Sequence, residues 1–75
     1  MNKSRRKRIS DIITKLNNIA SEIEEIKDEE DEAYDNLPDG LKLADKGIKM
    51  EDNVSTLEGC SIDIESMVLA LKDML

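Results

Sequence analysis

The chain has 75 residues, of which 39% are apolar and 39% are charged, with one aromatic residue and no histidine. Without histidine it cannot use a histidine-containing catalytic triad, an imidazole general base or the common histidine-bearing zinc sites. With no Phe or Trp, its core must be built from Ile, Leu, Val and Met, and a chain this short buries little of them. A stable solitary monomer is therefore not expected.

Cysteine content and hydropathy suggest the compartment. The single cysteine, Cys60, cannot form an internal disulfide, which favours a reducing environment. No apolar run reaches the ~18 residues of a membrane span, and the basic start lacks the apolar stretch of a signal peptide. We therefore expect a cytoplasmic protein with no membrane partner.

Charge is divided between a basic tip and an acidic body. The net charge is -7, yet five of the eleven basic residues fall within the first eight positions: Lys3, Arg5, Arg6, Lys7 and Arg8. Residues 9–75 carry the other six basic residues and all eighteen acids. Nine of those acids lie between Glu22 and Asp35, a density that repels nucleic acid and keeps the segment solvated.

Apolar residues recur with the helical period through the first half of the chain. The stripe contains Ile9, Ile12, Ile13, Leu16, Ile19, Ala20, Ile23, Ile26, Ala33, Tyr34 and Leu37. This spacing predicts a helix over residues 9–36, with the basic residues 1–8 as an arm or as the start of that helix near Asn2 or Ser4. Glu30 falls on the stripe, where its carboxylate either reaches water or forms a buried polar contact that fixes the register.

The helical pattern breaks at Pro38. Proline lacks a backbone donor and disfavours helix at the residue before it, and the following Asp39-Gly40 is typical of a turn. We expect a turn over residues 37–45, with one short helical turn from Pro38 to Lys42. Within residues 37–45, three leucines are expected to cover the end of the apolar seam, and one aspartate is expected to be the N-cap of the next helix. These residues are Leu37, Leu41, Leu43 and Asp45.

A second helix of similar length is predicted over residues 46–75. Its seam alternates four and three residues through Met50, Val54, Leu57, Ser61, Ile64, Val68, Leu71 and Leu75. Further apolar residues widen this seam on both sides, more than one partner helix can cover, which calls for another copy of the chain. The residues expected between copies are Leu57, Cys60, Ile62, Ile64, Met67, Leu69, Leu71 and Met74.

Two long helices joined by a short turn form an antiparallel hairpin. The predicted fold is therefore all-α and a single domain. We expect this two-helix hairpin to assemble as a four-helix-bundle dimer or a higher oligomer.

The side chains offer little for catalysis or metal binding. The acids of residues 28–35 lack the Asp-x-Asp-x-Asp-Gly loop of calcium sites, and a two-helix hairpin has no cleft that excludes water. We interpret Cys60 as a buried apolar thiol, and Met50, Met67 and Met74 as packing residues. No enzymatic activity, metal or cofactor is expected.

Three segments carry a resemblance to a known group of proteins: the turn Asn36-Leu37-Pro38-Asp39-Gly40-Leu41, the segment Asp45-Lys46-Gly47 and the pair Met50-Glu51. They resemble short, mostly uncharacterised helical-hairpin proteins of bacteriophages and other mobile elements, in which Leu-Pro-x-x-Leu precedes a Ser-Glu-Arg-Gly-like segment and Met-Glu. Here Ala44 replaces the capping hydroxyl of that pattern. The resemblance implies a phage or prophage origin in a bacterial host. Such accessory proteins commonly bind and block a host or defence component.

Three functions remain open. The first is an interaction protein that self-associates and binds, or inhibits, a host or defence protein. Its candidate partner-binding residues are Glu25, Asp28, Glu29, Glu32, Pro38, Lys46 and Gly47. A variant of this function is nucleic-acid mimicry by the acids from Glu22 to Asp35.

The second function is an oligomeric binder of nucleotide or nucleic-acid phosphate through Lys3, Arg5, Arg6, Lys7 and Arg8. The simpler alternative for these residues is a solubilising terminus beside the end of the second helix. No aromatic residue lies among them to stack on bases. The third function is a structural scaffold whose self-association is its whole activity.

Overall fold

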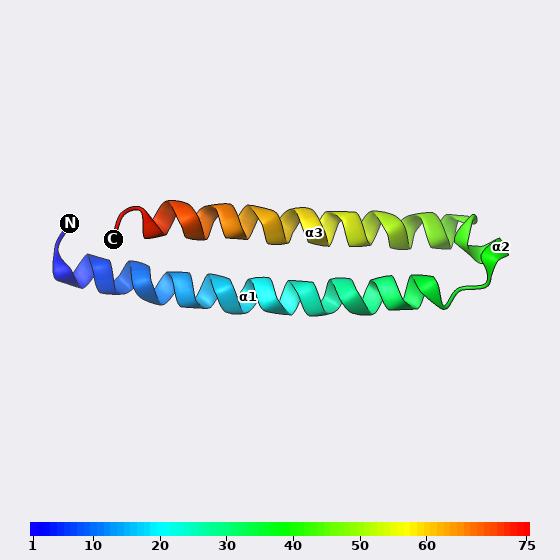
Figure 1. Ribbon diagram of the computed structural model, residues 1–75, viewed down its shortest axis with the longest axis horizontal. Coiled ribbons are helices and arrows are strands. Elements are labelled where there is room, and N and C mark those ends of the chain that lie inside the picture. The colour runs from blue at the N-terminus through cyan, green and yellow to red at the C-terminus, as the bar shows by residue number, and fades with distance from the viewer.

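The computed structural model describes residues 1–75 and consists of helices and turns. Helices α1 (Lys3–Asp35) and α3 (Asp45–Lys72) lie antiparallel and side by side, joined by the short α2 (Asp39–Lys42) (Figure 1). Both termini lie at one end and α2 at the other, in a molecule measuring 58 × 15 × 12 Å. The prediction of an all-α helical hairpin is confirmed.

Helix α1 includes most of the basic segment. Asn2 is its N-cap, because the side-chain Oδ1 accepts a hydrogen bond from the backbone N–H of Arg5 at 2.9 Å. The basic residues from Lys3 to Arg8 therefore form the first turns of a regular helix. Of the two alternatives for this segment, the start of the helix is correct, and each basic side chain has a defined direction around α1.

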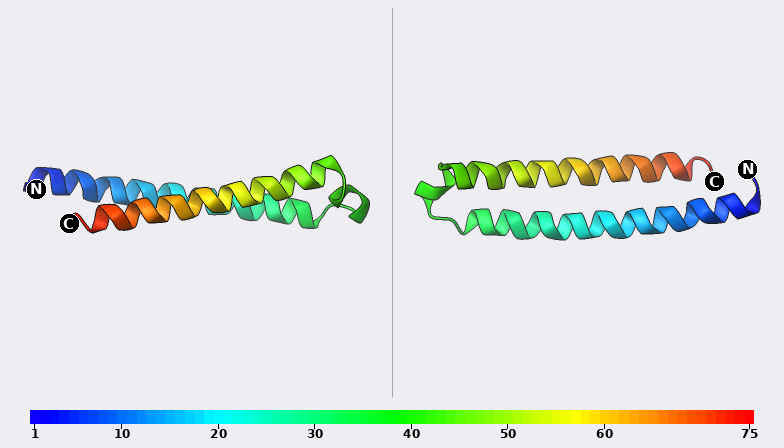
Figure 2. Two further views of the ribbon diagram at one scale, coloured as in Figure 1. Left: turned by 90° about the horizontal axis from the view of Figure 1, so that it is seen from above. Right: turned by 180° about the vertical axis from the view of Figure 1, so that it is seen from behind.

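One side of each long helix forms the seam of the hairpin. On α1, Ile13 is buried and its neighbours at three- and four-residue spacing, such as Ile9 and Leu16, pack against the core. On α3, Ile64 and Val68 are buried. Figure 2 shows the two helices crossing at a shallow angle, the packing in which apolar residues that repeat every seven positions stay between two helices.

The position of this seam corrects the expected contact between copies. Ile64 is buried inside the single hairpin, Leu71 packs against it, and Leu57 is half-buried. Within the single hairpin, these three side chains are already wholly or partly covered, so they offer a second copy less surface than predicted. Helix α3 also ends at Lys72, short of the predicted residue 75, so Leu75 is 51% exposed and does not extend the seam.

The short helical turn predicted from Pro38 to Lys42 is present as α2, with Pro38 in the N-cap position. The prediction that Asp45 caps the next helix is wrong. Ala44 occupies the N-cap of α3 without a side-chain hydrogen bond, and Asp45 is already the first helical residue. There its negative charge stabilises the positive end of the helix dipole.

The leucines of the turn do not all cap the seam. Leu37 is half-buried, but Leu41 is 45% exposed and Leu43 is 85% exposed. The chain reverses through α2, which lies beyond the end of α1, so these two side chains extend past the seam. The predicted cap is therefore wrong for Leu41 and Leu43.

Gly47 allows α2 to lie close to the first turn of α3. It is buried, and a Cβ at its position would lie 2.6 Å from the carbonyl oxygen of Leu41 and closer still to that of Lys42. The Leu41 carbonyl accepts the backbone N–H of Ala44 at 3.2 Å, so it is not free to move away. Gly47 therefore has a packing role and leaves the set of exposed partner-binding candidates.

A polar pair crosses the seam towards the turn end of the hairpin. Asn53 Nδ2 donates a hydrogen bond to Glu30 Oε2 at 2.9 Å, and both residues are half-buried. Of the two alternatives for Glu30, the structure therefore favours the polar contact. Since such a pair is satisfied only when α1 and α3 are correctly aligned, it contributes to the register of the hairpin.

We expect the two members of this pair to be energetically coupled. In a double-mutant cycle of Glu30→Ala and Asn53→Ala, urea unfolding should give a coupling free energy of about 1 kcal/mol, typical of a net side-chain hydrogen bond. A parallel cycle of Asn53→Ala with Glu25→Ala, whose exposed side chain lies on another face of α1, should give none. Equal coupling in the two cycles would contradict the assignment.

Candidate interaction surfaces

Part of the apolar surface left outside the seam forms a stripe along one side of the hairpin. On α1, Ile12, Ile19 and Ile26 recur every seven residues and are 44%, 46% and 48% exposed. On α3 and the residues that follow it, three exposed residues recur at the same interval: Cys60, Met67 and Met74. Ile12 and Met74 line the same hollow, and antiparallel helices rise equally per residue, so Ile19 lies level with Met67 and Ile26 with Cys60. We name these six residues the apolar flank.

Ile62 and Leu69 of the expected interface lie as predicted, on the opposite side of the seam from Cys60, whereas the burial predicted for Cys60 differs from the structure. Ile62 and Leu69 are exposed, and they occupy the other side of α3, separated from the apolar flank by the seam position Ser61. Cys60 was expected to be a buried thiol and is exposed, so that prediction is wrong. It lies one residue before the seam, at the rim of α3, where no side chain of α1 covers it.

On the opposite side of the seam, the residues that line the junction between α1 and α3 are mostly polar, and Ile62 and Leu69 lie further out on α3. Ser61 Oγ donates to Glu24 Oε1 at 3.5 Å across the two helices, and Asp31 and Glu51 line a shallow pocket there. Seven-residue spacing extends this polar flank through Ser10, Asn17, Glu58 and Glu65. The hairpin therefore has one flank suited to apolar contact and one suited to water.

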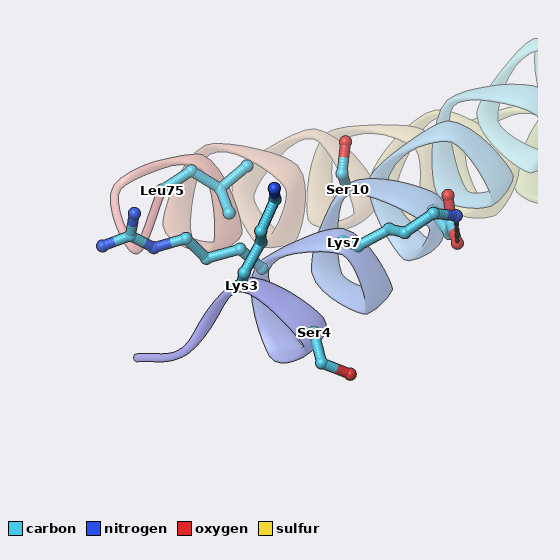
Figure 3. A pocket seen from close by; sticks show the side chains of 7 residues that line it. Lys3, Ser4, Lys7, Ser10 and Leu75 are labelled. Atoms are coloured by element: carbon cyan, nitrogen blue, oxygen red, sulfur yellow. Dashed lines mark hydrogen bonds and ion pairs between the residues drawn. The ribbon is translucent and has the colours of Figure 1, made fainter.

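The basic N-terminal residues are divided between the two flanks. Lys3, Arg6 and Lys7 line a groove beside Leu75 at the open end of the hairpin. Figure 3 shows Lys3 and Ser10 pointing to the side where Leu75 lies, whereas Ser4 points away. The other two members, Arg5 and Arg8, line the hollow beside Ile12 and Met74. The five candidate phosphate-binding residues thus form two separate sets.

Lys7 also has a partner within its own helix. Its Nζ lies 3.5 Å from Asp11 Oδ2, and both side chains are mostly exposed. Exposed ion pairs of this type contribute about 0–1 kcal/mol to stability. Breaking the pair with Asp11 therefore costs little free energy, and Lys7 remains available to an incoming anion.

The remaining partner-binding candidates are exposed: Glu25, Asp28, Glu29, Glu32, Pro38 and Lys46. Except for Glu30, the acids between residues 22 and 35 are exposed, and most of them lie on the half of α1 that faces away from α3. Glu24 lies on the polar flank, Glu30 lies in the seam, and Glu25 and Glu32 lie on the outer side. The acids therefore form a broad exposed surface, and nucleic-acid mimicry stays a prediction.

Tyr34 connects all three helices near the turn. The Nζ of Lys42 in α2 lies 5.5 Å from the centroid of its ring, a cation–π distance. Tyr34 and Glu51 of α3 line the same shallow pocket, and interaction with the nearby Glu51 carboxylate raises the pKa of Tyr34, as do desolvation and the negative charge of Asp35. Sequence periodicity places Tyr34 on the apolar stripe but gives no signal for these two contacts.

Since Tyr34 is the only aromatic residue, its titration can be followed directly by tyrosinate absorbance. We expect a midpoint above that of free tyrosine, ~10, and Glu51→Gln should lower it. The raised pKa favours the protonated form in the folded state, so its stabilisation is present below pH ~10 and is lost as pH rises through the folded value. Glu58→Gln, on the same helix, is the control and should leave the midpoint unchanged.

The hairpin contains no group of three or more cysteine, aspartate or glutamate side chains arranged to hold a metal ion. None of its helices is both long enough and apolar enough to cross a membrane. Comparison of the chain with protein-family models, curated proteins and solved structures finds no match.

Proposed function

We propose that this chain is a non-enzymatic interaction protein whose copies assemble through the apolar flank and bind a partner protein through their charged outer surfaces. The apolar flank is the observation that carries the proposal. A single hairpin buries only Ile13, Ile64 and Val68 among its apolar side chains. An exposed apolar stripe beside so small a core is typical of an interaction surface.

The burial pattern also supports a role without catalysis. No polar or charged side chain is buried. Desolvation and close charge partners are the main means by which proteins tune catalytic acids and bases. The exposed charges are better suited to recognition of another macromolecule.

Sedimentation equilibrium and native mass spectrometry test the assembly. We expect one oligomer at micromolar concentration that dissociates on dilution, with helix content falling as it dissociates because each hairpin has a small core. A fully folded monomer over the whole concentration range would contradict the proposal.

The outer side of α1 is the surface that this assembly leaves free, and the resemblance to phage accessory proteins favours a bacterial host or defence protein as partner. In affinity capture from a bacterial lysate, we expect a protein retained by the wild type and lost with Glu25→Gln/Glu32→Gln. The matched control, Glu58→Gln/Glu65→Gln, removes the same charge from the polar flank. Equal retention by the two variants contradicts this partner surface, and no specific capture beside a stable oligomer favours the scaffold alternative.

Phosphate binding is the second candidate function, favoured by the groove that gathers Lys3, Arg6 and Lys7. With a fluorescent single-stranded oligonucleotide, Lys3→Ala/Arg6→Ala should weaken binding and reduce the slope of log affinity against log salt by about 1.4. Lys46→Ala/Lys49→Ala is the matched control, because it removes the same charge at the opposite end of the hairpin, and it should have the smaller effect. Equal losses in the two variants would show attraction by net charge alone.

A further inference from the structure

Charges beside the apolar flank change sign along α1. Arg8 and Lys15 line the hollow next to Ile12, towards the open end of the hairpin. Towards the turn, exposed acids occupy the equivalent positions: Glu22 follows Ile19 by three residues and Glu29 follows Ile26 by three. Residues three and four apart share a helix face, so these four charges form one edge of the apolar flank. The sign changes at the level of Ile19.

We propose that a second copy of this chain covers the apolar flank, with α1 packed antiparallel on α1 of the second copy and a two-fold axis passing near Ile19 and Met67. This deepens the assembly in the proposed function and rests on it. Ile19 then meets Ile19 of the second copy, and Ile12 meets Ile26. The resulting four-helix bundle has a continuous apolar interior made by both flanks.

The edge charges are complementary in this arrangement. An antiparallel pairing centred on Ile19 places Lys15 beside Glu22 of the second copy and Arg8 beside Glu29. Symmetry repeats both contacts, so each dimer contains four opposite-charge pairs at its rim. Exposed acids on the polar flanks then face water on both sides of the bundle.

The same charges disfavour the other two-fold arrangement. If the axis ran along the hairpin, α1 would pack on α3 of the second copy. Because Ile19 is level with Met67, this would place Glu22 beside Asp63 and Lys15 beside Ala70. A repulsive pair would replace an attractive one, and the cation would lose its partner. Charge at an interface rim selects orientation in this way.

Disulfide trapping tests the axis. In a Cys60→Ser background, Ile19→Cys should form a covalent dimer under mild oxidation, since the axis brings residue 19 next to its own copy. Ile12→Cys alone should not, because 14 helical positions separate the two copies of residue 12 by about 21 Å. Mixing Ile12→Cys chains with Ile26→Cys chains should give the heterodimer. In the unmodified chain, Cys60 should not cross-link to Cys60 of the second copy, because it lies seven positions from the axis at Met67 and the two cysteines are again 14 helical positions apart.

Charge reversal tests the pairing independently. Lys15→Glu and Glu22→Lys should each weaken association by roughly tenfold, as expected for two exposed pairs lost and replaced by repulsion. The double variant Lys15→Glu/Glu22→Lys should restore wild-type association, because the pair is reversed and intact. Glu25→Lys, on the outer side of α1, is the matched control and should have little effect.

Failure of the assembly and failure of this geometry are distinguishable. A wild-type chain that is monomeric at all concentrations contradicts both. A stable oligomer in which the Ile19→Cys variant does not cross-link and the double charge reversal does not restore association contradicts only the geometry, and the proposed function stands.

Discussion

Gly47→Ala is expected to destabilise the hairpin by about 2 kcal/mol, the cost of forcing an added atom into a closely packed site. The new Cβ would lie 2.6 Å from the carbonyl oxygen of Leu41 and closer to that of Lys42. Both obstacles are backbone atoms, and the Leu41 carbonyl is held by its hydrogen bond to Ala44. Relief therefore requires α2 to move away from α3. Urea unfolding followed by circular dichroism, at one fixed protein concentration, measures the loss.

Gly59→Ala is the matched control for this substitution. Gly59 lies in α3 as Gly47 does, but a Cβ there would meet nothing within 4 Å. Because alanine is the better helix former, Gly59→Ala should stabilise the chain by up to about 1 kcal/mol. Because only Gly47 of the two glycines contacts α2, the same glycine-to-alanine change in one helix should lower the free energy of unfolding at residue 47 and raise it at residue 59. A stabilised Gly47→Ala would show that α2 does not pack as described.

Ile19→Glu is expected to weaken self-association by at least a hundredfold, the largest effect of any single change outside the seam. The side chain is 46% exposed in one hairpin, so the substitution costs little within a single copy. In the proposed dimer it lies on the two-fold axis and would bring two carboxylates together in an apolar interior, which is strongly unfavourable. Sedimentation equilibrium measures the dissociation constant.

Ile62→Glu makes the same substitution at a similarly exposed isoleucine, 55% exposed, on the other side of α3. It should leave the dissociation constant unchanged. If Ile62→Glu dissociates the oligomer and Ile19→Glu does not, copies meet through the opposite face of the hairpin. Helix content at matched concentration shows whether the dissociated chain stays folded.

The pattern of the sequence determined the hairpin, because helix period, turn chemistry and seam spacing are local properties. The seam of α3 through Ile64 and Val68 was predicted, as was the short helix after Pro38. Proline and glycine act on their immediate neighbours, so a break at Pro38 follows without knowledge of the rest of the chain.

Only the tertiary structure decided which apolar residues of α1 remain exposed. Ile12 and Ile13 are adjacent in the sequence, yet Ile13 is buried at 8% exposure and Ile12 is 44% exposed, because about 100° of helix rotation turns one towards α3 and the other away from it. Likewise, only the relative position of α2 and α3 shows that Gly47 is buried against backbone carbonyls. Periodicity describes one helix at a time, whereas spare surface and close approach depend on where a second helix lies.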